Sequence, residues 1–329
     1  MTQLSRRRLL QGMGAVGLAA GCAGPAPVAR LDPHGPRQAG VARPAVPQAH
    51  CDVSVWDLAD VSALPAISGR VTELAERDLT VTVGLGPRFA DVDPLPEFAG
   101  ERLDHAGGDL LLQICGDDLF AVSTAVAELG RLAGAPRWRQ TGFRGPAGAD
   151  GAARNTLGFT DGVVVPRGDE ELDREVWCDD GSTVAVVRRM RLDLDGFAAL
   201  PVAEQERVFG RRKETGEPLS GGSEVDLGAK TPDGQYLIPV DAHVRRAHPL
   251  TSGSGLMLRR SYNYDNGMAD RGLLFVSFQR ELRTFVNTMH RMAEGDALLT
   301  WATTTASAAF RILPGFTPDR PLTTRGPRR

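Results

Sequence analysis

Two short segments of the sequence concentrate side chains that can move protons, hold an anion or bind a metal ion. The first is 158–162, Gly-Phe-Thr-Asp-Gly, and the second is 241–264, which contains two histidines and two Arg-Arg pairs. A carboxylate can transfer protons, an imidazole can ligate a metal, and a guanidinium can stabilise an anion. Each residue type also has an ordinary explanation, because aspartate between glycines is common in turns and a single histidine is more often a core residue. The two segments therefore indicate a site only in combination.

Composition and charge argue against several classes of protein. The chain has 329 residues, of which 42% are hydrophobic and 24% charged, with a formal net charge of -3. These values argue against disorder and against a protein with many membrane spans. They also provide no positive field that would gather nucleic acid or acidic lipid. The four cysteines are too few for a disulfide framework and lack the paired spacing of a zinc site.

Familiar nucleotide-binding and hydrolase motifs are missing from the sequence. No GxGxxG follows a strand, and there is no Walker loop, GxSxG or HExxH. Nucleotide binding and serine hydrolysis are therefore disfavoured.

The elements that must position the two segments can be predicted from hydrophobic periodicity. Strict alternation or short apolar runs predict strands at 79–85, 109–115, 182–194 and 272–278. Apolar residues at helical spacing predict helices at 120–133, 201–209 and 281–293. Alternating strands of this kind favour antiparallel α+β layers over a doubly wound parallel sheet.

One position in the predicted strand 182–194 breaks its pattern. Arg188 is the one charged residue on the otherwise apolar face. Such an arginine either pairs with a buried anion or reaches solvent at the edge of the sheet, and we favour the edge.

The amino terminus has the features of an export signal. Arg6, Arg7 and Arg8 precede a weakly apolar run of about a dozen residues, which is too short to span a bilayer. This pattern resembles a twin-arginine signal, with an ordinary secretory signal or a disordered basic tail as alternatives. Cys22 follows Leu-Ala-Ala-Gly and is a candidate lipidation site, with simple cleavage as the alternative. Lipidation of Cys22 would leave three cysteines, so at least one is a free thiol or all three are buried and inert.

In this order and at these distances, the two segments resemble the dye-decolourising peroxidase family of haem enzymes. The resemblance covers most of residues 75–312. Further motifs that carry it are Val187-Arg-Arg-Met-Arg191, Glu204-Gln-Glu206, Phe209-Gly-Arg211, Thr215-Gly-Glu-Pro-Leu219 and Gly272-Leu-Leu-Phe275. The resemblance implies an α+β fold of two ferredoxin-like halves with antiparallel sheets and peripheral helices, of the dimeric α+β barrel type.

We expect four parts along the chain. Residues 1–22 would be the twin-arginine signal and 23–50 a proline-rich tether. Residues 51–155 would form the first ferredoxin-like half, and 156–329 would form the second half, which carries haem.

The family resemblance implies roles for the central residues. His243 would be the proximal ligand of haem iron, with His248 as its rival. Asp161 would be the distal acid-base group that moves a proton between the two oxygens of peroxide. Arg259 would stabilise the anionic peroxide. In a strand Arg260 would point to the other face, so only one of the two arginines can enter the pocket.

Other residues would complete the pocket. Met257 and Phe275 correspond to apolar residues that line the distal cavity in relatives. Arg245 and Arg188 are candidates to pair with haem propionates, and Glu281 is a candidate to accept the second N–H of the proximal histidine.

Two departures from the family pattern lie close to the distal site. Val163 follows the segment Gly158-Phe-Thr-Asp-Gly162, where relatives often have a small polar residue. Ser261 stands where some relatives have asparagine, so peroxide activation would depend more heavily on Asp161 and Arg259.

The function implied is a haem peroxidase that uses haem b (iron protoporphyrin IX). It would reduce hydrogen peroxide and oxidise dyes, phenols or metal ions. The twin-arginine machinery would export it folded, to lie outside the cell or anchored through Cys22 to the outer face of the membrane. No nucleic-acid partner is expected, and assembly into a homo-oligomer stays open. The alternatives are a haem-binding or iron-acquisition protein with little turnover, and a lipoprotein scaffold without haem.

Overall fold

The alternating segments of the sequence form strands that join in one large sheet. The computed structural model describes residues 31–148 and 151–324. Its strands are β1 (His50–Trp56), β2 (Thr80–Leu85), β3 (His105–Ala106), β4 (Leu110–Gly116), β5 (Pro136–Phe143), β6 (Ala153–Arg154), β7 (Thr160–Asp161), β8 (Thr183–Leu192), β9 (Leu258–Arg259), β10 (Tyr262–Asp265), β11 (Arg271–Gln279) and β12 (Ala302–Ile312). Its helices are α1 (Leu64–Ala75), α2 (Leu119–Ala133), α3 (Gly168–Glu175), α4 (Leu194–Ala198), α5 (Val202–Phe209), α6 (His243–Arg246), α7 (Pro249–Ser252), α8 (Leu282–Ala293) and the 3-10 helix η1 (Ala297–Trp301).

Two sets of four strands have the same spatial order. The first set runs β5-β1-β4-β2 and the second runs β12-β8-β11-β10, each with its first strand in a central position, as in ferredoxin-like units. β2 pairs with β12 and β10 pairs with β5, so the two sets close into a ring of antiparallel strands. Among the strands of residues 31–148 and 151–324, only β3 pairs in parallel, alongside β12. The expected α+β fold with antiparallel sheets and peripheral helices is confirmed, while the boundary between its halves at residue 155 stays a prediction.

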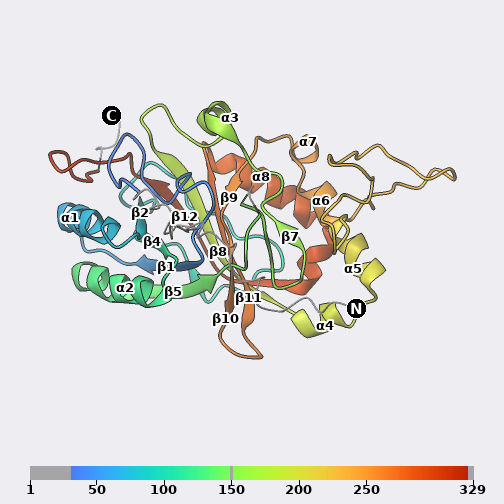
Figure 1. Cartoon of the computed structure of the whole chain (residues 1–329), viewed down its shortest axis with the longest axis horizontal. Coiled ribbons are helices and arrows are strands. Elements are labelled where there is room, and N and C mark those ends of the chain that lie inside the picture. Colours follow the sequence, from blue (N-terminus) through green and yellow to red (C-terminus); the bar gives the residue numbers. More distant parts are fainter. Residues whose placement is uncertain (1–30, 149–150, 325–329) are drawn as a thin grey trace, which may run out of the picture. The chain divides into compact units, whose positions relative to one another are not determined.

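Helices cover the outside of the sheet on two sides (Figure 1). α1 and α2 bury their apolar faces against β1, β2 and β4. α8 packs against β8 and β11 through Phe285, Met289 and Met292, the apolar face that the helical spacing predicts. A third cluster takes side chains from the strands of both sets, except β2, and forms the core inside the ring. The sheet therefore has its own core, and α8 can border a separate cavity.

The segment before β1 packs against the sheet instead of forming a tether. Gln38 is buried, and its amide donates to the carbonyl oxygens of Val83 and Leu313, both at 2.8 Å. Val41 is fully buried in the core of the ring. The prediction of an extended tether is therefore wrong for residues 31–49. Gln38 satisfies backbone groups of Val83 and Leu313, and Val41 adds to the core. The expected signal and Cys22 lie outside the described residues.

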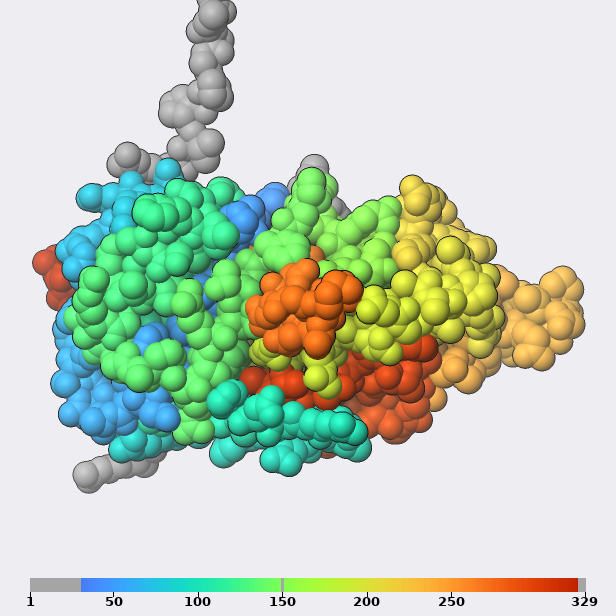
Figure 2. Space-filling model, turned by 90° about the horizontal axis from the view of Figure 1, so that it is seen from below, coloured from blue at the N-terminus to red at the C-terminus, as the bar shows by residue number. Residues whose placement is uncertain are grey.

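A long connection between α5 and α6, residues 210–242, contains no helix or strand, and its amber part projects at one end in Figure 2. Gly210 ends α5 in the left-handed conformation, with φ of 85°. A Cβ at this position would lie 2.4 Å from Cγ1 of Val244, which follows His243. Glycine therefore allows the end of α5 to approach α6 closely.

No helix within residues 31–148 and 151–324 has the length and apolar character needed to cross a bilayer. Over the same residues, Cys51, Cys115 and Cys178 form no disulfide, and the first two are buried.

Candidate active site

A cavity beside α8 brings most of the predicted site residues together. Its walls are largely apolar and come from β8, β11, α5, α8 and the segment before β9. The charged and titratable side chains that line it are Asp161, Arg188, Arg211, His243, His248 and Arg259. An apolar pocket with a few converging polar groups is the usual form of a cofactor or active site.

His243 presents one ring nitrogen to this cavity. It begins α6, and its Nδ1 lies 2.7 Å from Oδ2 of Asp296, whose side chain is fully buried. Burial disfavours the protonated ring, but the charge of Asp296 and its hydrogen bond prevail and raise the pKa of His243. Nε2 forms no hydrogen bond with any described residue, and 31% of the side chain is accessible because it lines the cavity. An Nδ1–H held by a carboxylate leaves the Nε2 lone pair free to bind a metal.

His248 lines the same cavity in the opposite tautomer. Its Nδ1 accepts a hydrogen bond from the backbone N–H of Leu250 at 3.2 Å, which caps α7. Burial and the nearby Arg211 lower its pKa, so the neutral ring is favoured. A neutral imidazole that accepts at Nδ1 carries its proton on Nε2. The geometry therefore favours His243 over His248 as a metal ligand.

Asp161 and Arg259 form a pair elsewhere on the cavity wall. Oδ1 of Asp161 accepts from the N–H of Gly162 at 2.6 Å and lies 3.5 Å from Nη2 of Arg259. Arg259 is held by a second hydrogen bond, from Nη1 to the carbonyl of Val164 at 3.0 Å. Arg260 instead is buried away from the cavity and donates to the carbonyl of Pro44 at 2.7 Å. A proton carrier and a fixed positive charge thus lie side by side, both close enough to influence His243 electrostatically.

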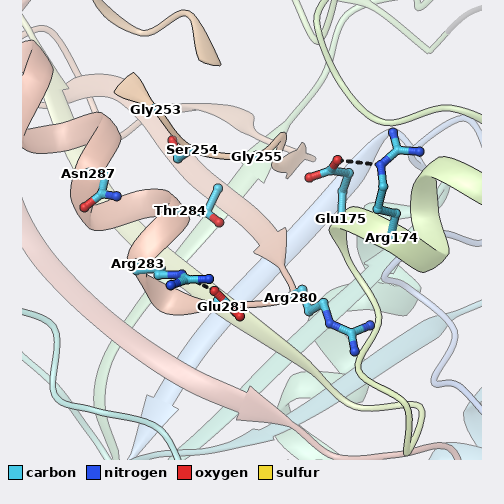
Figure 3. A pocket seen from close by; sticks show the side chains of 10 residues that line it. All are labelled: Arg174, Glu175, Gly253, Ser254, Gly255, Arg280, Glu281, Arg283, Thr284 and Asn287. Atoms are coloured by element: carbon cyan, nitrogen blue, oxygen red, sulfur yellow. Dashed lines mark hydrogen bonds and ion pairs between the residues drawn. The ribbon is translucent and has the colours of Figure 1, made fainter. Parts of the chain in front are cut away.

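The prediction for Glu281 is wrong. Its carboxylate pairs with Arg283 at the start of α8, lines a different cavity (Figure 3) and makes no contact with His243. Asp296 holds the ring instead. Little in the sequence indicates that Asp296 would bind His243. It follows a glycine after a helix and caps η1 by accepting from the N–H of Leu298. An aspartate in that setting reads as an ordinary helix cap.

The prediction that Arg188 reaches a sheet edge is also wrong. Arg188 is buried on β8 and forms an ion pair with Glu101, with a further hydrogen bond to Oγ1 of Thr304 at 2.9 Å. It lines the cavity, but its charge is already balanced by that of Glu101, which leaves it poorly suited to hold a propionate.

Arg245, unlike Arg188, does not line the cavity, so the structure does not support it as a propionate partner. Its guanidinium donates to the carbonyls of Leu227 and Ile238, both at 2.8 Å, and stacks on Tyr236. It therefore anchors the long connection to α6.

Arg211 is better placed than Arg188 or Arg245 for the role that the sequence analysis assigned to those two residues, binding of a haem propionate. It lines the cavity, is largely buried, and donates from Nη1 to the carbonyl of Gly216 at 2.9 Å. Burial and the charge of Arg259 lower its pKa. Arg211 has no ion-pair partner within the described residues. An uncompensated guanidinium on the wall of an apolar cavity is suited to binding a carboxylate.

Three features of the cavity fit a haem. The free Nε2 of His243 can ligate iron, Arg211 can hold a propionate, and the apolar walls, which include Met257 and Phe275, can contact the macrocycle. Across residues 31–148 and 151–324, no group of three or more His, Cys, Asp and Glu could hold a bare metal ion. A single imidazole beside an apolar cavity therefore matches a prosthetic group better than a mononuclear metal centre.

Comparisons with known proteins agree with this geometry. Residues 152–317 match the family model described as Dyp-type peroxidase, C-terminal. The dye-decolorizing peroxidase of Thermobifida fusca is 36% identical over 73% of this chain and 65% of its own length. The deferrochelatase of Escherichia coli O157:H7 is 31% identical over 94% of each chain. Among solved structures, a DyP-type peroxidase of Streptomyces coelicolor is 31% identical with a TM-score of 0.83, over 89% of this chain and 95% of its own. DtpA of Streptomyces lividans, solved as an oxyferrous complex, is 32% identical with a TM-score of 0.82, over 89% of this chain and 96% of its own.

Proposed function

Because the chain belongs to the DyP-type peroxidase family, we propose that it reduces hydrogen peroxide at haem b bound through His243 and oxidises dyes, phenols or metal ions. The observation that supports this best is the placement of two pairs on one cavity. The His243–Asp296 pair leaves a nitrogen free for iron, and the Asp161–Arg259 pair supplies a proton carrier beside a fixed positive charge.

The two pairs have different roles in the proposed reaction. When bound, haem supplies the iron at which the O–O bond of peroxide breaks. Asp161 accepts a proton from one peroxide oxygen and returns it to the other, which leaves as water. Arg259 stabilises the negative charge that develops on the peroxide, and its bond to Val164 keeps the guanidinium in place. Asp296 orients His243 and increases its electron donation to the iron.

The alternative is haem handling in iron acquisition with little turnover. It is favoured by one observation, since the relatives that match over 94% of their length carry the name deferrochelatase. Such a protein would need His243 but not both Asp161 and Arg259. Their joint presence on the cavity wall supports the peroxidase.

An absorption spectrum before and after one equivalent of peroxide tests the proposal. We expect a Soret band in the haem-loaded protein that changes on mixing with peroxide and returns when a phenol is added. A band that does not respond to peroxide, together with free porphyrin released on incubation, would favour the iron-acquisition alternative. Failure to bind haem at all would refute both.

The proposed location is outside the cytoplasmic membrane, after twin-arginine export and with Cys22 as a lipid anchor. The support is the Arg6–Arg8 run and the short apolar segment that follows it. Replacing Arg6, Arg7 and Arg8 with lysine should keep the protein in the cytoplasm, as measured by cell fractionation. Cys22→Ser should release exported protein from the membrane if Cys22 is lipidated.

A further inference from the structure

Two free cysteines face each other inside the ring of strands. Cys51 on β1 and Cys115 on β4 are directly opposite in the antiparallel register, and both side chains belong to the core inside the ring. The Cα atoms of residues directly opposite in an antiparallel pair lie about 4.5–5.5 Å apart. A disulfide spans Cα distances of about 4.4–6.8 Å. The two strands therefore hold these cysteines at a separation that a disulfide can bridge.

Arg260 brings a positive charge close to this pair. Its side chain is buried and donates to the carbonyl oxygen of Pro44 at 2.7 Å, but it forms no ion pair with any residue in 31–148 or 151–324. Both thiols interact electrostatically with its guanidinium, and Arg144 adds a second positive charge nearby. A buried charge is costly unless a group of opposite charge compensates it. A thiolate at this position would supply that compensation.

Hydrogen-bond donors converge on Cys115 and distinguish it from Cys51. The hydroxyl of Tyr262 and Nε2 of Gln113 each lie 3.6 Å from Sγ of Cys115. A hydrogen bond from the Cys51 thiol, supported by that of Tyr262, lowers the pKa of Cys115 in spite of its burial. Burial raises the pKa of Cys51, and the charge of Asp52 adds to this effect. Cys115 is therefore the thiolate of the pair, and Cys51 keeps its proton.

Gly142 allows Tyr262 to reach the two cysteines. Gly142 lies opposite Cys51 where β5 pairs with β1. A Cβ at Gly142 would lie 2.7 Å from Cβ of Tyr262. Because β5 has no side chain at this position, the tyrosine can extend across β5 and β1 to Cys115 on β4. Burial raises the pKa of Tyr262, so the phenol keeps its proton and stays a donor.

Of the two thiols, Cys115 is the more accessible. It is 4% exposed, whereas Cys51 is fully buried. The segment 31–49 packs close to this part of the ring, and Nε2 of Gln113 lies 3.4 Å from the carbonyl oxygen of Gly40. So small an exposed area excludes a bulky disulfide reagent and favours an oxidant of the size of hydrogen peroxide.

We propose that Cys51 and Cys115 form a second site of reaction with hydrogen peroxide, in which the two thiols become a disulfide without the help of haem. The Cys115 thiolate attacks one peroxide oxygen, so the S–O bond forms as the O–O bond breaks, and the Cys51 thiol gives its proton to the departing hydroxide. Cys51 then attacks Sγ of Cys115, the S–S bond forms, the S–O bond breaks, and the second hydroxide leaves as water with a proton from solvent. Two thiols and one hydrogen peroxide thereby yield one disulfide and two waters, and the two electrons lost by sulfur reduce the peroxide.

The test counts thiols in protein that has first been reduced and then freed of reductant. Haem-loaded protein is mixed with excess hydrogen peroxide, in parallel with protein that holds zinc protoporphyrin, which fills a haem cavity without reacting with peroxide. Remaining thiols are alkylated with N-ethylmaleimide in denaturant, and linked peptides are identified by mass spectrometry. Cys178 is the matched control, because its Sγ lies 3.2 Å from Nη1 of Arg311 but faces no second cysteine.

We expect peroxide to remove the Cys51 and Cys115 thiols together in both preparations, and a dithiol reductant to restore them, while Cys178 keeps its thiol. Cys51→Ser should stop at a sulfenic acid on Cys115, which dimedone traps, and Cys115→Ser should leave Cys51 unreacted. Tyr262→Phe should slow the loss of thiols about tenfold, because a hydrogen bond to a charged sulfur is lost. Cys178→Ser should react at the wild-type rate.

Three outcomes would overturn the inference. The first is that wild-type protein keeps both thiols in peroxide. The second is that the disulfide forms with haem but not with zinc protoporphyrin, which would show that the oxidised cofactor takes the electrons. The third is that Cys178 is oxidised as fast as Cys115. The response of the Soret band to peroxide tests the proposed peroxidase function separately, because the thiol reaction does not pass through haem.

Discussion

His243 and His248 lie five residues apart on one cavity, and their hydrogen bonds give them different capacities for metal binding. Asp296 holds the Nδ1 side of His243, whereas His248 uses Nδ1 to accept from a backbone N–H. We predict that His243→Ala abolishes stable haem binding, a larger effect than the roughly 10- to 100-fold cost of losing an outer-shell partner. His248→Ala should retain the Soret band. Haem titration followed by absorbance measures both, and a normal five-coordinate spectrum in His243→Ala would contradict the assignment.

The roles of Asp161 and Arg259 can be tested separately from haem binding, because neither residue supplies the nitrogen atom proposed to bind iron. We predict that Asp161→Ala slows the reaction with peroxide about 10²- to 10⁴-fold and Arg259→Ala about 10²- to 10³-fold, while haem stays bound. Stopped-flow absorbance on mixing with peroxide measures the rate. The exposed Asp195→Ala is the control and should react at the wild-type rate. Wild-type rates in both site variants would rule out the distal roles.

At the scale of the residue, the contact of Asp296 with His243 could not be predicted from the local sequence. It lies 53 residues from His243, and its contact with the ring depends on how α8 returns the chain to α6. Glu281 was preferred from its place in the family pattern, but it comes at the opposite end of the same helix. Motifs were enough to predict that His243 and Asp161 belong to one site, and both line the same cavity, whereas a partner defined only by tertiary packing could not be predicted.

At the scale of the element, the turn after α5 positions both Arg211 and α6. Gly210 and Gly221 have nearly the same positive φ, 85° and 81°, but a Cβ on Gly210 would meet Val244 and one on Gly221 would meet nothing within 4 Å. We predict that Gly221→Ala costs about 1–2 kcal/mol for the left-handed backbone alone. Gly210→Ala should cost about 1–3 kcal/mol more from overpacking. Denaturant unfolding measures both, and equal losses would show that the approach to Val244 does not matter.

Long periodic elements could be predicted from the sequence, and short ones could not. The alternation at 79–85 and the run at 109–115 match β2 and β4 within a residue or two, and the apolar spacing at 281–293 matches α8. β7 and β9, which carry Asp161 and Arg259, are two residues long. Two residues show no periodicity, so such strands exist only because a neighbouring strand supplies their hydrogen bonds.

At the scale of the whole molecule, closure of the sheet explains why Arg188 is paired. The alternating pattern of the strand favoured a sheet edge for Arg188, but β8 lies between β12 and β11 in a ring where β10 joins both β5 and β11. A central strand offers no route to solvent, so a charge on its covered face needs a buried partner. Glu101, which comes from the part of the chain before β3, supplies that partner. Ring closure depends on contacts far apart in sequence and so could not be inferred from the pattern of one strand.

This buried pair yields a prediction about the stability of the whole fold. Both side chains are almost fully buried, at 2% and 5% exposed, and burial lowers the pKa of Arg188. We predict that Glu101→Ala destabilises the protein by about 3–5 kcal/mol, because it leaves an uncompensated buried charge. The double change Glu101→Leu with Arg188→Met should recover most of this loss, since apolar residues of similar volume replace both charges. Glu73→Ala, at an exposed ion pair with Arg70, should cost less than about 1 kcal/mol. Urea unfolding of the protein without haem measures all three, and a loss in Glu101→Ala as small as that in Glu73→Ala would show that Arg188 finds another partner or reaches water.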